Sequence, residues 1–82
     1  MNKNISAMIE ELVSEAIEAG DVAALEYISD EVQAAIDEMV EDGPAFATDD
    51  WAQAKRDELR TAIRQARGQI EIDRAAAARR AN

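Results

Sequence analysis

The sequence predicts an all-α protein, a small helical bundle of three principal helices. Apolar residues recur at three- and four-residue intervals through most of the chain, which is the spacing that places them on one face of a helix. Gly20 and the Gly43-Pro44 pair divide this pattern into segments, because both residue types commonly end helices. At 82 residues the chain has the length of one small domain. We therefore expect residues 1–82 to form a single helical domain.

The first helix is expected over residues 5–19. Asn4 or Ser6 can cap its start, because either side chain can accept a hydrogen bond from a free backbone N–H group. Gly20 suits the left-handed conformation in which many helices end. Seven apolar residues keep helical spacing along the segment: Ile5, Met8, Ile9, Leu12, Val13, Ala16 and Ile17.

The second helix is expected over residues 21–42, with Asp21 as its N-cap and Gly43-Pro44 as its end. Two alternatives stay open at Ser29. A continuous or gently kinked helix, which we favour, leaves Tyr27 among the acids of the outer face, whereas a break near Ser29 would let Tyr27 turn inward. The apolar face consists of Val22, Leu25, Ile28, Val32, Ile36, Met39 and Val40.

Residues 28–43, ISDEVQAAIDEMVEDG, repeat much of residues 5–20, ISAMIEELVSEAIEAG. An internal duplication would explain the likeness, and so would two antiparallel helices that use the same start and stop signals. We favour the second interpretation, because helices made of Ala, Glu and Ile resemble one another by chance.

The third helix is expected over residues 49–80, after a loop over residues 43–48 whose Phe46 should tuck into the core. Thr48 or Asp49 can cap it. A straight helix of this length spans about 48 Å, whereas a compact chain of this size has a radius of gyration near 12 Å. We therefore expect a bend near Gly68, frayed last turns or a second subunit over the excess length.

The composition argues against catalysis and against bound cofactors. The chain has no Cys and no His, so it lacks a thiol nucleophile, the usual general base and the commonest zinc ligands. No metal site is expected, since no Glu-x-x-His pair or calcium loop is present. No apolar run approaches the roughly 20 residues of a membrane span, and the amino terminus does not resemble a signal peptide. We expect a cytoplasmic protein, in the host cytoplasm if it is viral, that is not an enzyme.

The charge is divided unevenly along the chain. Residues 1–50 carry 14 acids and one Lys, whereas residues 51–82 carry 8 basic residues and 4 acids. On helical spacing the acids form rows opposite the apolar face, and five same-sign pairs each cost roughly 0.2–0.5 kcal/mol. An arginine row on the third helix could offset this cost within the fold or in a second subunit: Arg56, Arg60, Arg64, Arg67 and Arg74.

Alternatively, a bare acidic face would itself be useful. An ordered surface of carboxylates can replace the phosphates that a nucleic-acid-binding protein neutralises. In size, acidity and lack of catalytic residues the chain resembles viral DNA mimics that inhibit restriction enzymes or CRISPR effectors. This resemblance implies a phage-encoded inhibitor with a basic, nucleic-acid-binding protein as partner and no direct contact with nucleic acid. The expected contact residues are Glu11, Glu15, Glu18, Asp30, Glu31, Asp37, Glu38, Glu41 and Asp42.

The second hypothesis is an oligomeric helical adaptor or assembly protein. Here the third helix packs against another chain, which could be a second copy in a homodimer, through Trp51 and Ile72. The opposite charges of the two halves would steer that association.

Overall fold

The computed structural model describes residues 4–81 and contains three helices in this part of the chain. They are α1 (Ile5–Ala19), α2 (Val22–Asp42) and α3 (Asp49–Ala81). The predicted all-α bundle of three principal helices is therefore confirmed, with boundaries within one residue of those expected.

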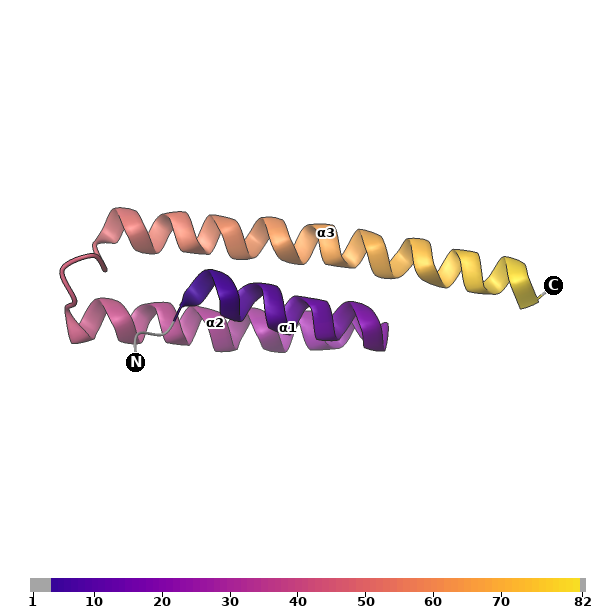
Figure 1. Cartoon of the computed structure of the whole chain (residues 1–82), viewed down its shortest axis with the longest axis horizontal. Helices are drawn as coiled ribbons and strands as arrows, with labels where there is room; N and C mark the ends of the chain where they lie inside the picture. Colours follow the sequence, from indigo (N-terminus) through magenta and orange to yellow (C-terminus); the bar gives the residue numbers. More distant parts are fainter. Residues whose placement is uncertain (1–3, 82) are drawn as a thin grey trace.

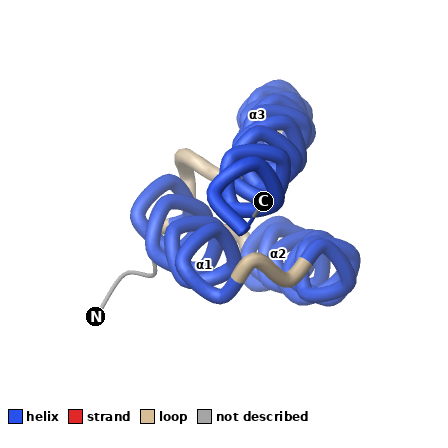
Figure 2. Tube along the Cα trace, turned by 90° about the vertical axis from the view of Figure 1, so that its right-hand side faces the viewer, coloured by secondary structure: helices blue, strands red, loops and turns tan. Residues whose placement is uncertain are grey.

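The helices form a triangular bundle in which each contacts both of the others (Figure 2). The short turn at Gly20 and Asp21 makes α1 and α2 antiparallel neighbours. After the loop of residues 43–48, α3 runs antiparallel to α2 and packs on one side of the α1–α2 pair (Figure 1). The opposite side of this pair is left uncovered by α3.

The core lies along the axis between the three helices and is built from aliphatic side chains and alanines. All three helices supply it at intervals of three and four residues, as an amphipathic pattern requires. Among the described residues no polar or charged residue is buried. The buried core consists of Ile5, Ile9, Val13, Ala16, Leu25, Ile28, Val32, Ala35, Ile36, Ala52, Leu59, Ala66 and Ile70.

Each helix is preceded by a residue whose side chain accepts a hydrogen bond from the backbone N–H group three residues later. Asn4, Asp21 and Thr48 supply these oxygens, at N···O distances of 3.1, 3.2 and 3.2 Å. Asn4, and not Ser6, caps α1. The first two helices end at glycines in the left-handed conformation, with φ of 65° at Gly20 and 73° at Gly43, which side chains rarely adopt.

α2 is continuous across Ser29, so the alternative of a break there is wrong. The Ser29 hydroxyl accepts a 2.9 Å hydrogen bond from Nε2 of Gln33, one turn later, and does not cap a new helix. Tyr27 consequently points outward and is 70% exposed. The two similar stretches therefore start differently: residues 5–20 begin at the first residue of α1, whereas residues 28–43 begin inside α2. Both stretches end at the glycine that caps their helix.

α3 passes Gly68 without interruption and extends beyond the α1–α2 turn as a single helix (Figure 1). Its 33 residues correspond to about 50 Å. The radius of gyration is 15.1 Å and the longest axis 55 Å, so the chain is more extended than a compact domain of its size. Between residues 71 and 80 only Ala76 is even partly buried. We call residues 71–81 the α3 extension.

The expectation that Phe46 enters the core is wrong. Its side chain is 46% exposed, and its ring packs edge-on against Trp51 with centroids 5.5 Å apart. Ala47 is the buried residue of this loop. Phe46 therefore packs on Trp51 at the surface, and the small side chain of Ala47 is the one that the loop buries.

Candidate functional site

The acidic residues predicted as a contact face are all exposed and come from α1 and α2. Glu11, Glu15 and Glu18 lie on the side of α1 away from its buried residues, because each is about 120° or more from Ile9 around the helix. Glu31, Glu38 and Glu41 lie on the part of α2 turned away from α3, whereas Asp30 and Asp37 lie nearer α3. We call these eight residues, together with Asp42, the acidic face.

Few groups of the acidic face are engaged within the described chain. Asp37 Oδ1 accepts a 2.7 Å hydrogen bond from Nη2 of Arg56, and Glu38 also has an interaction with a neighbouring group. Between residues 4 and 81, the other seven carboxylates form no ion pair and no hydrogen bond. Among residues 4–81, arginines therefore leave seven of the nine carboxylates uncovered, and Arg56 joins the arginine row to this face at Asp37.

The arginine row is directed elsewhere. Arg60 is 3.7 Å from Asp57 on its own helix, and Arg74 donates a 2.8 Å hydrogen bond to the carbonyl oxygen of Gly20 at the end of α1. Arg67 has no ion pair or hydrogen bond to any described residue. These arginines flank the side of α3 that faces α2, whereas most of the acidic face lies on the far side of the α1–α2 pair.

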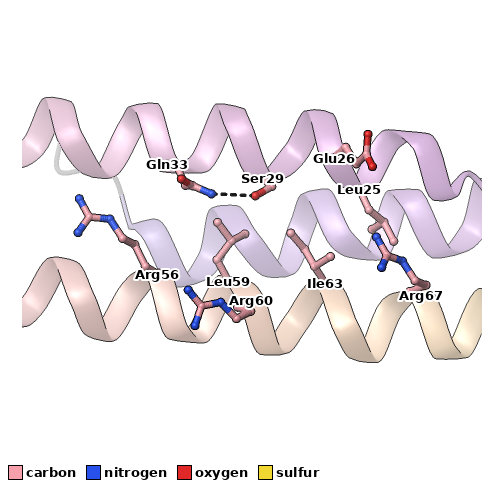
Figure 3. Close-up of a pocket in the computed structure, with 9 residues that line it drawn as sticks. All are labelled: Leu25, Glu26, Ser29, Gln33, Arg56, Leu59, Arg60, Ile63 and Arg67. Atoms are coloured by element: carbon pink, nitrogen blue, oxygen red, sulfur yellow. Dashed lines mark hydrogen bonds between the residues drawn. The ribbon is translucent and has the colours of Figure 1, made fainter.

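A recess of about 240 Å³ lies between α2 and α3, and Arg56, Arg60 and Arg67 line it. Figure 3 shows the three arginines rising from α3, with the hydrogen-bonded Ser29 and Gln33 on α2 facing them. The sequence analysis placed the arginines in a row but missed this recess. Its walls come from two helices, and only their relative rotation brings them together.

The two residues expected to mediate self-association are in different settings. Trp51 is partly buried and packs against the core, whereas Ile72 is 63% exposed on the α3 extension. They are 21 residues apart on one helix, or about 31 Å. A single apolar patch cannot contain both of them.

A polar cluster that the sequence analysis missed connects α1 to α3. Lys55 Nζ donates to Oγ of Ser6 at 2.7 Å, and this hydroxyl donates to Oε2 of Glu58 at 2.9 Å. Lys55 and Glu58 are 3.5 Å apart. Because the lysine is the donor to the serine, it cannot accept the serine proton as a catalytic base must. The cluster fixes the start of α1 against α3.

In the described part of the chain, no group of three or more acidic side chains is arranged to hold a metal ion. None of the helices there combines the length and apolar character needed to cross a membrane. No protein-family model, curated protein or solved structure matches the chain. The surface chemistry is therefore the basis for any functional assignment.

Proposed function

We propose that this chain is a small acidic inhibitor that binds a nucleic-acid-binding protein through the acidic face and blocks its basic groove. Its function is binding and not catalysis. The observation that supports this proposal best is that seven of the nine carboxylates are exposed and have no partner among residues 4–81. A phage protein acting in the host cytoplasm on a restriction enzyme or CRISPR effector fits this chemistry.

The density of charge on the acidic face supports mimicry of a phosphate backbone. The seven carboxylates without a partner among residues 4–81 lie on α1 and α2, over a length close to that of α2, whose 21 residues span about 31 Å. This is about one charge every 4.4 Å, of the same order as the roughly 3.4 Å spacing of phosphates along one DNA strand. A basic groove that neutralises phosphates would therefore meet a similar linear charge.

Tyr27 adds an aromatic surface to the acidic face. The tight turn at Gly20 and Asp21 sets residues equally distant from it at about the same height, so Tyr27 lies level with Ser14 and within about one turn of Glu11, Glu15 and Glu18. An exposed ring among carboxylates attracts guanidinium and ammonium groups by charge and by cation–π contact. Arginine is therefore the side chain this face should prefer.

The proposal is tested by capture and competition. The chain is immobilised, exposed to lysates of candidate host bacteria, and washed at increasing salt. We expect capture of a basic protein that duplex or single-stranded nucleic acid displaces, because both compete for one groove. The purified partner should then lose its binding to labelled nucleic acid when the chain is added in equal amount.

A matched pair of variants distinguishes the acidic face from net charge. Glu15→Lys with Glu18→Lys should abolish capture. Glu71→Lys with Asp73→Lys changes the net charge equally on the α3 extension and should leave capture nearly intact. Equal losses in both variants, or a captured protein that nucleic acid does not displace, would overturn the proposal.

The α3 extension favours a second candidate function, that of an oligomeric adaptor. It exposes Ile72, and it extends past the α1–α2 turn (Figure 1). If a second copy packs there, sedimentation should show a dimer that Ile72→Asp dissociates, whereas Ala78→Asp, about 120° away around the helix, should have less effect. A monomer throughout the micromolar range would remove this alternative.

A further inference from the structure

We infer that the recess between α2 and α3 binds an acidic peptide segment of a partner protein, in extended conformation, with an apolar residue between two carboxylates. This surface is separate from the acidic face and has the opposite charge preference. The inference is therefore independent of the proposed function, and either can fail alone.

The recess combines an apolar floor with cationic edges. Leu25 and Leu59 are almost fully buried beneath it, and the partly buried Ile63 completes the floor. Arg60 and Arg67 lie on either side of Ile63 along α3 (Figure 3). An apolar group can thus rest on Ile63 while an anion meets a guanidinium at each end.

Both arginines have hydrogen-bond donors available. Arg67 has no partner among residues 4–81. Arg60 has only the 3.7 Å contact with Asp57, in which both side chains are more than half exposed, and such pairs contribute little. By contrast, Arg56 is held by Asp37 at 2.7 Å. The free guanidinium groups can therefore form paired hydrogen bonds with incoming carboxylates.

The dimensions indicate a peptide and not a small molecule. The recess has about 240 Å³, below the roughly 300–1,000 Å³ typical of small-molecule pockets, and it accommodates side chains one at a time. Arg60 and Arg67 are seven residues apart, about 10 Å along the helix. Carboxylates four residues apart in an extended peptide lie on one face of it, about 13 Å apart, and the residue midway between them lies on the same face. Two flexible arginine side chains can span this separation while the middle residue rests on Ile63.

The net charge of −9 does not prevent this binding. Most of the acidic face lies across the α1–α2 pair from the recess, at a distance of at least a helix diameter of about 10 Å, which is comparable to the Debye length at physiological salt. Nearby carboxylates also affect a bound anion. Glu26 lines the recess, Asp57 is 3.7 Å from Arg60, Asp37 is paired with Arg56, and the exposed Asp30 follows Ser29 on α2. Of these, Glu26 is the one that should repel a bound carboxylate.

The test uses the full chain labelled with ¹⁵N and the unlabelled peptide acetyl-Gly-Ser-Glu-Ser-Leu-Ser-Glu-Ser-Gly-amide, whose two Glu and Leu share one face when the peptide is extended. We expect a Kd of about 1 mM or tighter, with amide shifts concentrated around Ser29, Gln33, Arg60, Ile63 and Arg67. Peptides with Gln for both Glu, or with Ser for the Leu, should bind at least about tenfold more weakly. Shifts confined to the α3 extension, or no binding up to several millimolar, would overturn the inference.

Variants separate the recess from general charge. Arg60→Gln with Arg67→Gln should weaken binding at least about tenfold, whereas Arg79→Gln with Arg80→Gln removes the same charge from the α3 extension and should change it less than about twofold. All four arginines are exposed, so folding should survive, as circular dichroism can verify. Equal losses in the two variants would contradict a specific site.

Glu26→Gln gives a test with the opposite sign. It removes the carboxylate that opposes the ligand, so affinity for the acidic peptide should rise, which a purely structural role of the recess would not produce. A thymidylate oligonucleotide is titrated in parallel. Tighter binding of this oligonucleotide at the same amides would assign the recess to nucleic acid and overturn the peptide inference.

Discussion

Arg56 reaches from α3 to α2 and donates a 2.7 Å hydrogen bond to Asp37, the one described ion pair between the arginine row and the acidic face. Both side chains are substantially exposed, at 38% and 63%. A double-mutant cycle with Arg56→Gln and Asp37→Asn should give a coupling of about 0.5 kcal/mol, and no more than about 1 kcal/mol, declining with added salt.

Asp30→Asn is the control for this cycle. Asp30 is exposed and has no partner among residues 4–81, so its coupling with Arg56→Gln should be near zero. Urea unfolding at two salt concentrations measures both couplings. A large, salt-independent value for the Arg56–Asp37 pair would mean that the pair is much better shielded from water than its exposure indicates.

Two glycine substitutions should have opposite effects on stability. Gly20→Ala forces an alanine into the left-handed conformation at φ 65° and should lower the free energy of unfolding by about 1 kcal/mol. Gly68 is inside α3, and a methyl group added there would meet open space, so Gly68→Ala should raise it by about 0.5–1 kcal/mol. Thermal unfolding followed by circular dichroism measures both. A stabilising Gly20→Ala would contradict the turn geometry.

Loss of the α3 cap should be measurable in spite of its exposure. Thr48 Oγ1 accepts a hydrogen bond from the backbone N–H of Trp51, and Thr48→Ala should cost about 1 kcal/mol. Thr61→Ala is the matched control, because Thr61 is exposed inside α3 and alanine favours helices. The control should be neutral or slightly stabilising. Equal destabilisation of both variants would rule out a special role for the cap.

Truncating a core side chain should lower the free energy of unfolding much more than Thr48→Ala or Thr61→Ala does. Leu25 is completely buried in α2, and Leu25→Ala should cost about 2–5 kcal/mol. Small domains have a stability of about 5 kcal/mol, so the variant should keep at most about 3 kcal/mol and should unfold at a clearly lower temperature. Leu12→Ala, at a partly buried position, should cost less. Retention of a sharp unfolding transition near the wild-type temperature would show that the core tolerates this cavity.

Helix boundaries could be predicted closely because they depend on neighbouring residues. Asp21, Gly20 and Gly43 each act within one turn, so their chemistry is visible in sequence. The continuity of α2 at Ser29 was less certain from sequence, since a serine can either cap a helix or lie within one. In the structure Ser29 faces Gln33 inside the helix, and packing of Ile28 and Val32 in the core keeps the helix intact.

The sequence predicts which residues share a face of the candidate site, but not how those faces are oriented relative to one another. Helical spacing identified which acids share a face with Glu11 and which arginines share a row with Arg60. It could not show which row faces which helix, since this depends on the rotation of α3 over the α1–α2 pair. The same limit applies to Phe46, because a loop side chain packs according to the space that the helices leave.

The α3 extension also affects how the chain moves through solution. With axes of 55, 21 and 16 Å, the molecule is a rod that sweeps out a larger volume than a sphere of the same mass. A monomer should therefore leave a gel-filtration column earlier than a globular standard of 9.0 kDa and could be mistaken there for a dimer. Light scattering, which measures mass without assuming shape, is the appropriate way to count subunits.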